Sequence, residues 1–347
     1  MRILWSILLC LVFLPDFDGD AMLPLYASDV SMWADPVRLD PAHPELRTVG
    51  RLTWLGGIAL KSRDPAFGGF SSLLVTGDRF TLLSDGGNVT RFRMGTDFVP
   101  RDARFSALPD GPGPGWDKVD RDSESMTRDP ATGDIWAGFE TYNQLWRYNA
   151  ALDRAEAHAA PPAMADWPVN EGPESMVRLR SGQFLVIAET QPRPHRPGTR
   201  VALMFSGDPT KAPRRGYRFS YVPPKGFDPS DATELPDGDI MVLNRRFQLP
   251  FVFSNVVTIV PRAAIRPDAI VRGIPVATLA PPLIHDNFEG VAITREKGAT
   301  IVWLVSDDNQ QTLLQRTYLL KFRLEPEPES LSATLKRHRP APPPGHP

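Results

Sequence analysis

Acidic residues stand directly before short apolar runs at four places in the sequence. Glu174 in "NEGPESMVRL" and Glu289 in "DNFEGVAI" are the clearest, and Glu124 and Asp231 occupy similar places. Glutamate is a poor strand former and is costly to bury, so nothing local favours starting a strand this way. A second series of oxygen-bearing side chains follows the next apolar run of each unit: Asp85, Glu140, Glu189, Asn244 and Asp307.

These two series recur with the period of a propeller blade. Counting residues 55–58 as an earlier start without an acid, successive starts lie about 50 to 70 residues apart. Each unit has a short apolar strand, a turn rich in Gly, Asp or Pro, a second apolar strand and usually a third. In one unit, for example, the predicted second and third strands are Ile135–Phe139 and Gln144–Tyr148. The sequence predicts an all-β fold, a single β-propeller with five repeats and five or six blades. The alternative is a β-sandwich with coincidental spacing.

Ring closure and domain limits follow from the same pattern. A propeller must close on itself to protect its sheet edges. We therefore expect residues 49–54 to pair with the C-terminal blade, whose third strand ends near Leu324. The predicted domains are a leader over residues 1–28, the propeller over 29–324, and a proline-rich, disordered tail over 325–347.

The opening "MRILWSILLCLVFLP" resembles a secretory signal peptide: one Arg precedes an apolar stretch too short to span a bilayer. This predicts a periplasmic or secreted protein without a stable membrane span once the leader is removed. An uncleaved N-terminal anchor and a misassigned start are the alternatives. The one cysteine, Cys10, lies in this leader, so a processed chain has no disulfide, thiolate metal site or cysteine nucleophile.

Composition and charge bear on the class of partner and on the fold. A formal net charge of −2, and the absence of basic runs interleaved with aromatic residues, argue against nucleic-acid binding. The 37 prolines and 26 glycines suit many short strands and disfavour long helices. We expect a monomer that takes a small anionic or ester substrate.

Strand one of a blade begins where antiparallel strand two ends, so both series should converge at one mouth of the central channel. Crowded carboxylates raise one another's pKa unless a cation neutralises them. Oxygen ligands without Cys or a His cluster favour Ca²⁺. The predicted metal ligands are Glu124, Glu174, Glu289, Asp307, Asp231, Asp85 and Glu189. Alternatively, the acids are structural and accept backbone N–H groups or pair with arginines.

Basic residues are expected on the same face. Arg245 and Arg246 follow Asn244, and Arg316 lies in the loop after Asp307; guanidinium groups suit phosphate or carboxylate oxygens. We predict that these three arginines bind substrate, although simple salt bridging to neighbouring acids is equally compatible. His285 precedes the Glu289 motif and is a candidate general base, or a loop residue with a local hydrogen bond.

The motifs "WLGGIAL…LLSDGG", "DSESM", "NEGPESM", "DNFEGVAI" and "VSDDN…LQRTYLLKFRL", in this order, resemble the phytase-like domain family, also called the esterase-like activity of phytase family. The resemblance covers about residues 47–324. It implies an exported β-propeller that hydrolyses ester or phosphoester bonds. The likeness to calcium-dependent propeller phytases is too distant to transfer ligands residue by residue.

The expected function is therefore metal-assisted hydrolysis of a phosphoester or carboxylic ester, with Glu174, Glu289 and His285 as catalytic residues. The sequence contains no G-x-S-x-G, H-E-x-x-H, P-loop or G-x-G-x-x-G motif, which removes the usual support for other hydrolase and nucleotide-binding classes. A non-catalytic binding or scaffold propeller is the main alternative, and a lactonase-like hydrolase is also compatible.

Overall fold

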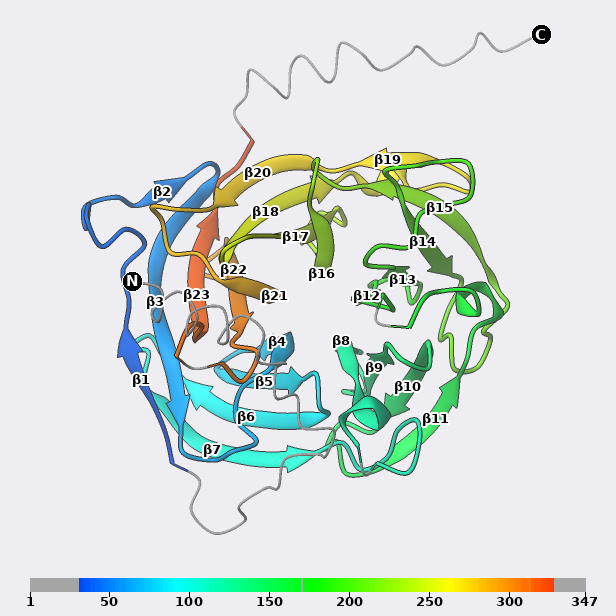
Figure 1. Ribbon diagram of the computed structural model, residues 1–347, viewed down its shortest axis with the longest axis horizontal. Helices are drawn as coiled ribbons and strands as arrows, with labels where there is room; N and C mark the ends of the chain where they lie inside the picture. Colours follow the sequence, from blue (N-terminus) through cyan, green and yellow to red (C-terminus); the bar gives the residue numbers. More distant parts are fainter. Residues whose placement is uncertain (1–30, 116, 170, 312, 328–347) are drawn as a thin grey trace, which may run out of the picture.

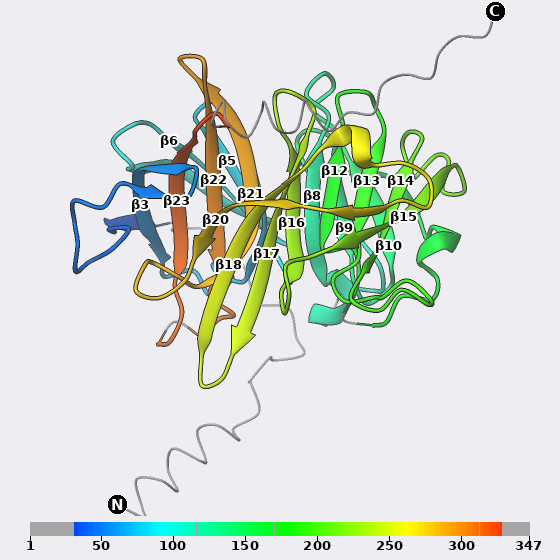
Figure 2. The same cartoon turned by 90° about the horizontal axis from the view of Figure 1, so that it is seen from above.

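Five β-sheets surround a central axis in the computed structural model, which describes residues 31–327 except 116, 170 and 312 (Figure 1). The sheets are the blades of a propeller, and the chain visits them in order around the ring. Figure 2 shows them edge-on. The predicted signal peptide and most of the predicted tail lie outside the described residues. No helix in the described ranges is long and apolar enough to cross a membrane.

Each blade is built on four antiparallel strands, numbered from the axis outward. Blade 1 contains β4 (Phe70–Thr76), β5 (Arg79–Ser84), β6 (Asn88–Met94) and β7 (Pro100–Ala107). Blade 2 contains β8 (Ser123–Arg128), β9 (Ile135–Phe139), β10 (Gln144–Tyr148) and β11 (Ala155–Ala159). Blade 3 contains β12 (Ser175–Arg178), β13 (Phe184–Ile187), β14 (Arg200–Phe205) and β15 (Gly216–Val222), with β19 (Ile270–Arg272) added in parallel.

Blade 4 contains β16 (Asp228–Glu234), β17 (Ile240–Gln248), β18 (Val252–Val260) and β20 (Ile274–Leu279). Blade 5 combines both ends of the chain: β21 (Asn287–Glu296), β22 (Ala299–Asp307), β23 (Thr317–Leu324), β3 (Leu52–Ser62) and β1 (Met32–Pro36), with β2 (Thr48–Val49) beside β3. Three short 3₁₀ turns lie between strands: η1 (Lys118–Arg121), η2 (Pro162–Met164) and η3 (Arg262–Ala264).

The ring closes in blade 5. Strand β23 pairs antiparallel with β3 along the whole length of β23, so the N-terminal part of the chain supplies the fourth strand of the C-terminal blade. The expected pairing is confirmed for residues 52–54 and continues to Leu60, whereas Val49 lies in β2 and pairs with β3 instead. The expectation that residues 55–58 start the first repeat was wrong, because they belong to this outer strand. Blade 1 starts at β4 instead, and there are five blades.

Apolar side chains pack between adjacent blades and hold the ring together. Trp54 of β3 meets Phe322 of β23 edge to face, with ring centroids 5.2 Å apart, and both join a buried cluster that extends to Leu243 of blade 4. Between blades 5 and 1, Phe80 packs against Trp303 with ring centroids 4.9 Å apart. Burial of such large rings stabilises the packing of each blade on the next.

The hairpin of β17 and β18 reaches beyond its neighbouring strands (Figure 2). It carries exposed apolar side chains: Phe247 is 46% exposed, Leu249 85% and Phe251 55%. This hairpin lies on the face where the innermost strands begin, because β17 ends where β16 starts. We call this side of the disc the site face.

Candidate functional site

Four of the five innermost strands begin with an irregularity in their pairing with strand two. In blades 1, 2, 4 and 5 one extra residue interrupts the pairing with strand two, which is a β-bulge. Bulges turn a side chain out of the regular alternation and are frequent near functional sites. In blade 3, Glu174 occupies the equivalent place just before β12. The residues at this position form the first ring: Ser71, Glu124, Glu174, Ser230 and Glu289.

Strand two of every blade ends beside this ring. In blades 1, 2, 4 and 5, the residue of strand two that pairs with the position before the bulge is followed by a residue that we assign to the second ring: Asp85, Glu140, Arg245 and Asp307. Blade 3 contributes Glu189, whose backbone N–H donates to the Gly172 carbonyl as that of Glu140 donates to the Asp122 carbonyl. The register places Arg245 opposite Asp228, exactly as it places Asp307 opposite Asn287. Both rings lie around the channel on the site face. The predicted convergence of the two series therefore holds, with two corrections in blade 4.

The first correction concerns Asn244. Its side chain is fully buried inside the blade, where Oδ1 accepts the Tyr221 hydroxyl at 2.8 Å and Nδ2 donates to the carbonyls of Val242 and Val256. Arg245, one residue later, takes the ring position. A shift of one residue along a strand turns a side chain to the opposite face, so sequence spacing alone misassigned the position.

The second correction concerns Asp231. The bulge of blade 4 falls on Ser230, so Asp231 is equivalent to Ser125 of blade 2 and lies one step deeper. Its Oδ1 accepts the N–H of Ala232 and its Oδ2 accepts the N–H of Val291 in the next blade, both at 2.7 Å. The structure does not bring Asp231 together with the other acids, and we leave it out of the proposed site.

Five carboxylates from blades 2 and 3 form the acidic cluster: Asp122, Glu124, Glu140, Glu174 and Glu189. Within the described residues they make two groups of three, Asp122–Glu124–Glu140 and Glu140–Glu174–Glu189, each with oxygens within 4.8 Å of one another. Oxygen ligands of Ca²⁺ lie 2.3–2.6 Å from the ion, so opposite ligands stand roughly 5 Å apart. Both groups match that spacing and share Glu140.

Burial makes the charged form of these acids costly. Burial, reinforced by Glu174, raises the pKa of Glu124 well above its usual value, and burial with Glu189 does the same for Glu174. The pKa of Glu140 rises to about 8 through burial and its neighbours Asp122 and Glu189. Without a cation, burial and mutual repulsion therefore favour the protonated forms of Glu124, Glu140 and Glu174.

Arg245 joins the acidic cluster to blade 5. Its guanidinium donates to Glu189 Oε1 at 2.8 Å, to Asn287 Oδ1 at 2.9 Å, and to Glu289. Burial opposes its charge, but Glu289 and Glu189 together raise the pKa of Arg245 above the usual value. Asn287 Nδ2 in turn donates to Glu289 Oε1 at 2.9 Å and to Asp307 Oδ2 at 3.3 Å. One arginine thus donates hydrogen bonds to carboxylates of two blades, blade 3 and blade 5.

The remaining predicted ligands lie on the blade 1 and blade 5 side of the ring. Asp85 forms an ion pair with Lys118 at 2.6 Å and is about one-fifth exposed. Asp307 is buried; burial and the nearby Glu289 raise its pKa well above the usual value. Both belong to the second ring, but neither belongs to the two groups of closely spaced oxygens.

The other predicted functional residues lie at varying distances from this centre. His285 is half-buried, and its Nδ1 lies 2.7 Å from the carbonyl of Leu283, which leaves Nε2 as the nitrogen able to accept a proton. Arg246 points away from Arg245 and stacks over the Phe227 ring at 4.5 Å. Arg316 is exposed, and its backbone N–H donates to Asp286 Oδ2 at 3.1 Å. Of the three predicted substrate arginines, only Arg245 contacts the clustered acids in the contacts described.

Two cluster members were not among the predicted metal ligands. Asp122 stands two residues before Glu124 and accepts the Thr141 hydroxyl at 2.7 Å. Glu140 belonged to the second series but was not assigned as a ligand. The available signal was that blade 2 alone has acids at both of these positions, in "RDSES" and "GFET".

Comparison with known proteins identifies the family of this chain. The sequence matches the family described as "Phytase-like: Esterase-like activity of phytase" over residues 65–310. This chain belongs to that family. The match includes both rings of the site. A search of curated proteins gave no match to the sequence.

Three solved structures that are similar to the phytase-like chain share only 10–11% of its sequence. A luciferin-regenerating enzyme matches at 11% identity and a TM-score of 0.39, covering 83% of this chain and 95% of the other. Glutaminyl cyclase of Myxococcus xanthus matches at 10% identity and a TM-score of 0.41, covering 75% and 92%. The Malassezia sympodialis allergen Mala s 1 matches at 10% and 0.41, covering 83% and 92%. Similarities this low carry no argument about function.

Proposed function

We propose that this phytase-like protein is an exported, calcium-assisted hydrolase of phosphoester or carboxylic ester bonds, and that the reaction occurs at the acidic cluster on the site face. The single observation that carries the proposal is the concentration of five carboxylates beside one arginine. Buried charge of one sign is stable only when protons or a cation neutralise it. Family membership supports the reaction class.

The donor set fits a hard cation. All side chains of the acidic cluster offer carboxylate oxygens, and the two groups have the span that ligands of one Ca²⁺ require. Asp122, Glu124, Glu140, Glu174 and Glu189 would hold the metal. Because the groups share Glu140, they suit either one ion or two ions with a common ligand.

A bound Ca²⁺ supplies Lewis acidity to a substrate oxygen. Arg245, which already meets carboxylates from both sides, would bind a phosphoryl or carboxylate oxygen and stabilise the negative charge that develops there. Hydrolysis adds the oxygen of water to phosphorus or carbonyl carbon and transfers a proton to the leaving alcohol. A group that does not bind the metal must carry that proton, and Glu289 and His285 are the candidates.

Glu289 and His285 keep supporting roles in this proposal. Glu289 holds Arg245 and Asn287 in place, so its removal would misdirect the guanidinium. His285 lies two residues before the strand that carries Glu289, and its Nε2 is available as an alternative base. The exposed apolar hairpin of β17 and β18 extends from Arg245, which favours including acyl esters beside phosphoesters as substrates.

The test is a substrate panel with p-nitrophenyl phosphate, bis-p-nitrophenyl phosphate, phytate, short acyl esters and a lactone, each with calcium and after metal removal. We expect turnover of at least one ester class with calcium. Glu174→Gln and Glu289→Gln should lower kcat by about a hundredfold or more, because each alters a charge at the reacting centre. Glu156→Gln, on the exposed outer strand of the same propeller, is the matched control and should keep wild-type activity.

Wild-type rates in both site variants would refute the assignment of the site. No turnover of any substrate with any metal would favour the alternative, a binding or scaffold propeller in which calcium has a structural role.

A further inference from the structure

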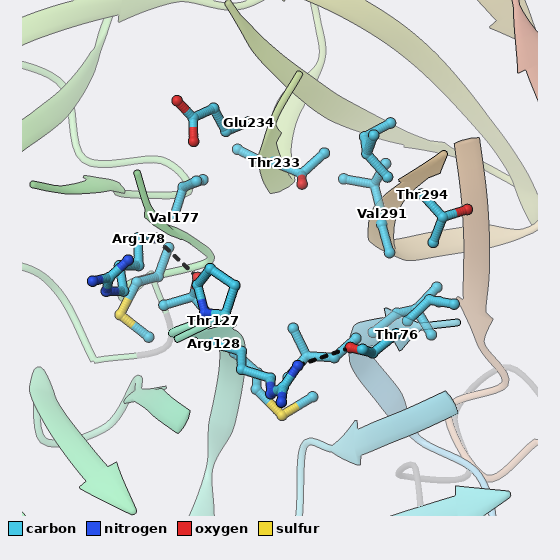
Figure 3. Close-up of a pocket in the computed structure, with 18 of the residues that line it drawn as sticks. Thr76, Thr127, Arg128, Val177, Arg178, Thr233, Glu234, Val291 and Thr294 are labelled. Atoms are coloured by element: carbon cyan, nitrogen blue, oxygen red, sulfur yellow. Dashed lines mark hydrogen bonds between the residues drawn. The ribbon is translucent and has the colours of Figure 1, made fainter. Parts of the chain in front are cut away.

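A pocket of about 340 Å³ lies at the end of the channel opposite the acidic cluster. The last residues of all five innermost strands, β4, β8, β12, β16 and β21, line it. Figure 3 shows these side chains arranged around an open centre. Glu124 and Arg128 both belong to β8, so the two ends of the channel are roughly 13 Å apart along this strand.

The floor of this pocket is apolar. Equivalent positions two residues beyond the first ring contribute buried side chains from every blade: Leu73, Met126, Met176, Ala232 and Val291. Each of these side chains belongs to a different one of the five apolar clusters that pack between adjacent blades.

Above this floor the walls carry hydrogen-bond donors. Arg128 Nη1 donates to Thr76 Oγ1 at 3.0 Å, and the backbone N–H of Arg178 donates to Thr127 Oγ1 at 2.9 Å (Figure 3). A threonine hydroxyl that already accepts a hydrogen bond still has its own proton to donate. The Thr233 hydroxyl of blade 4 also lines the wall. Three hydroxyl groups and a guanidinium therefore surround the opening.

The charges at the pocket do not balance. Four arginines and one glutamate line it: Arg128, Arg178, Arg180, Arg295 and Glu234. Arg178 pairs with Asp129 at 2.8 Å and Arg180 with Glu234 at 3.3 Å. The recorded partners of Arg128 and Arg295 are the Thr76 hydroxyl and the Gly298 carbonyl, and among the described ion pairs neither has a carboxylate. Within the part of the chain that the structure describes, these two positive charges therefore have no acidic partner.

We propose that this pocket binds a small doubly charged oxyanion of the phosphate or dicarboxylate class. Arg128 and the hydroxyls of Thr76, Thr127 and Thr233 would donate to its oxygens, and Arg295 would supply the second positive charge at the rim. Guanidinium groups and hydroxyls are the donors that such oxyanions prefer. The two ends of the channel would then bind ions of opposite charge: a cation on the site face and an anion at the opposite end. This inference does not depend on the hydrolase proposal.

The test is calorimetric titration of the full chain, freed of metal on a chelating resin, with inorganic phosphate in one arm and malonate in the other. We expect saturable binding of at least one anion. Arg128→Gln should weaken its affinity by about tenfold or more, because a charged hydrogen bond is lost. Thr233→Val should weaken it by about threefold, and Glu234→Gln should strengthen it.

Arg154→Gln is the matched control, because it removes an exposed arginine of the same blade that is paired with Glu156. Its affinity should equal that of the wild type, and thermal unfolding should confirm that every variant is folded. Tighter binding of phosphate than of malonate would assign the phosphate class, and the reverse order the dicarboxylate class. Absence of binding of both anions up to about 10 mM, or equal affinities in the wild type and the Arg128 variant, would overturn the proposal.

Discussion

Glu140 is the residue on which the candidate site depends most. It belongs to both groups of closely spaced oxygens, whereas Asp122 belongs to one and Glu174 to the other. Its backbone N–H also donates to the Asp122 carbonyl at 2.8 Å, which fixes its position beside the bulge of blade 2. Removing Glu140 should therefore affect every ion bound at the acidic cluster.

Calcium stoichiometry and affinity distinguish these residues. In calorimetric titration with Ca²⁺, Glu140→Gln should weaken all observed binding by about tenfold or more, an effect typical of changes around metal ligands. Asp122→Asn should weaken only one binding event if two ions are bound, because the second group lacks this residue.

Glu156→Gln is again the control. Unchanged calcium binding in Glu140→Gln would show that the acidic cluster is not the cation site, and the acids would then be structural groups held by protons and Arg245.

At the scale of the element, the bulges at the start of the innermost strands decide which side chains face the channel. They also connect neighbouring blades: the Ser71 hydroxyl donates to the Ser123 carbonyl at 2.6 Å, and that of Ser230 to the Phe288 carbonyl at 3.2 Å. In blade 4 the bulge falls on a serine, and Asp231 therefore binds the backbone of blade 5 instead of the site. Acids of similar sequence context thus serve different purposes.

Asp231→Ala tests this division. The substitution leaves the N–H of Val291 without its carboxylate partner in a buried place, which should lower the free energy of unfolding by about 1–3 kcal/mol. Calcium affinity should stay at the wild-type value. Urea unfolding and calorimetry measure the two effects separately.

The opposite outcome, unchanged stability with weakened calcium binding, would place Asp231 at the cation site after all.

At the scale of the whole molecule, closure of the ring keeps acids from different blades together. Strand β3 seals blade 5, and the buried cluster around Trp54 and Phe322 then fixes the angle between blades 4 and 5. The acidic cluster works against this assembly, since its carboxylates repel one another when ionised. The stability of the propeller should therefore depend on pH and on calcium.

The direction follows from the raised pKa values. Glu140 has a pKa of about 8 in the fold against an ordinary value of 4.5, so the folded state binds more protons between these limits. The contribution of this group to the stability of the metal-free protein is therefore fully present below about pH 4.5 and is lost as the pH rises from there through about 8. Bound calcium replaces the protons, so it should raise the melting temperature at pH 8 by at least about 4 °C and by less at pH 5.

Differential scanning calorimetry between pH 5 and 8, with and without calcium, measures this. Glu140→Gln should flatten the dependence on pH of the metal-free protein. A melting temperature that rises with pH in the absence of metal would contradict the expectation.

The sequence by itself determined the repeating plan of this propeller. Apolar runs between turn residues predicted strands such as Ile135–Phe139 and Gln144–Tyr148 with their observed bounds, since these strands depend on local alternation and turn chemistry. Because antiparallel pairing brings the start of strand one beside the end of strand two, the convergence of acids on one face was also predictable.

Only the tertiary structure decided which of two adjacent residues of a strand faces the channel. A bulge adds one residue to a strand without a fixed sequence signature, and one residue is the difference between Asn244 inside the blade and Arg245 in the site. Ring closure is likewise a contact between distant segments. Residues 55–58 have the small and apolar composition of a blade start, yet pairing with β23 makes them an outer strand.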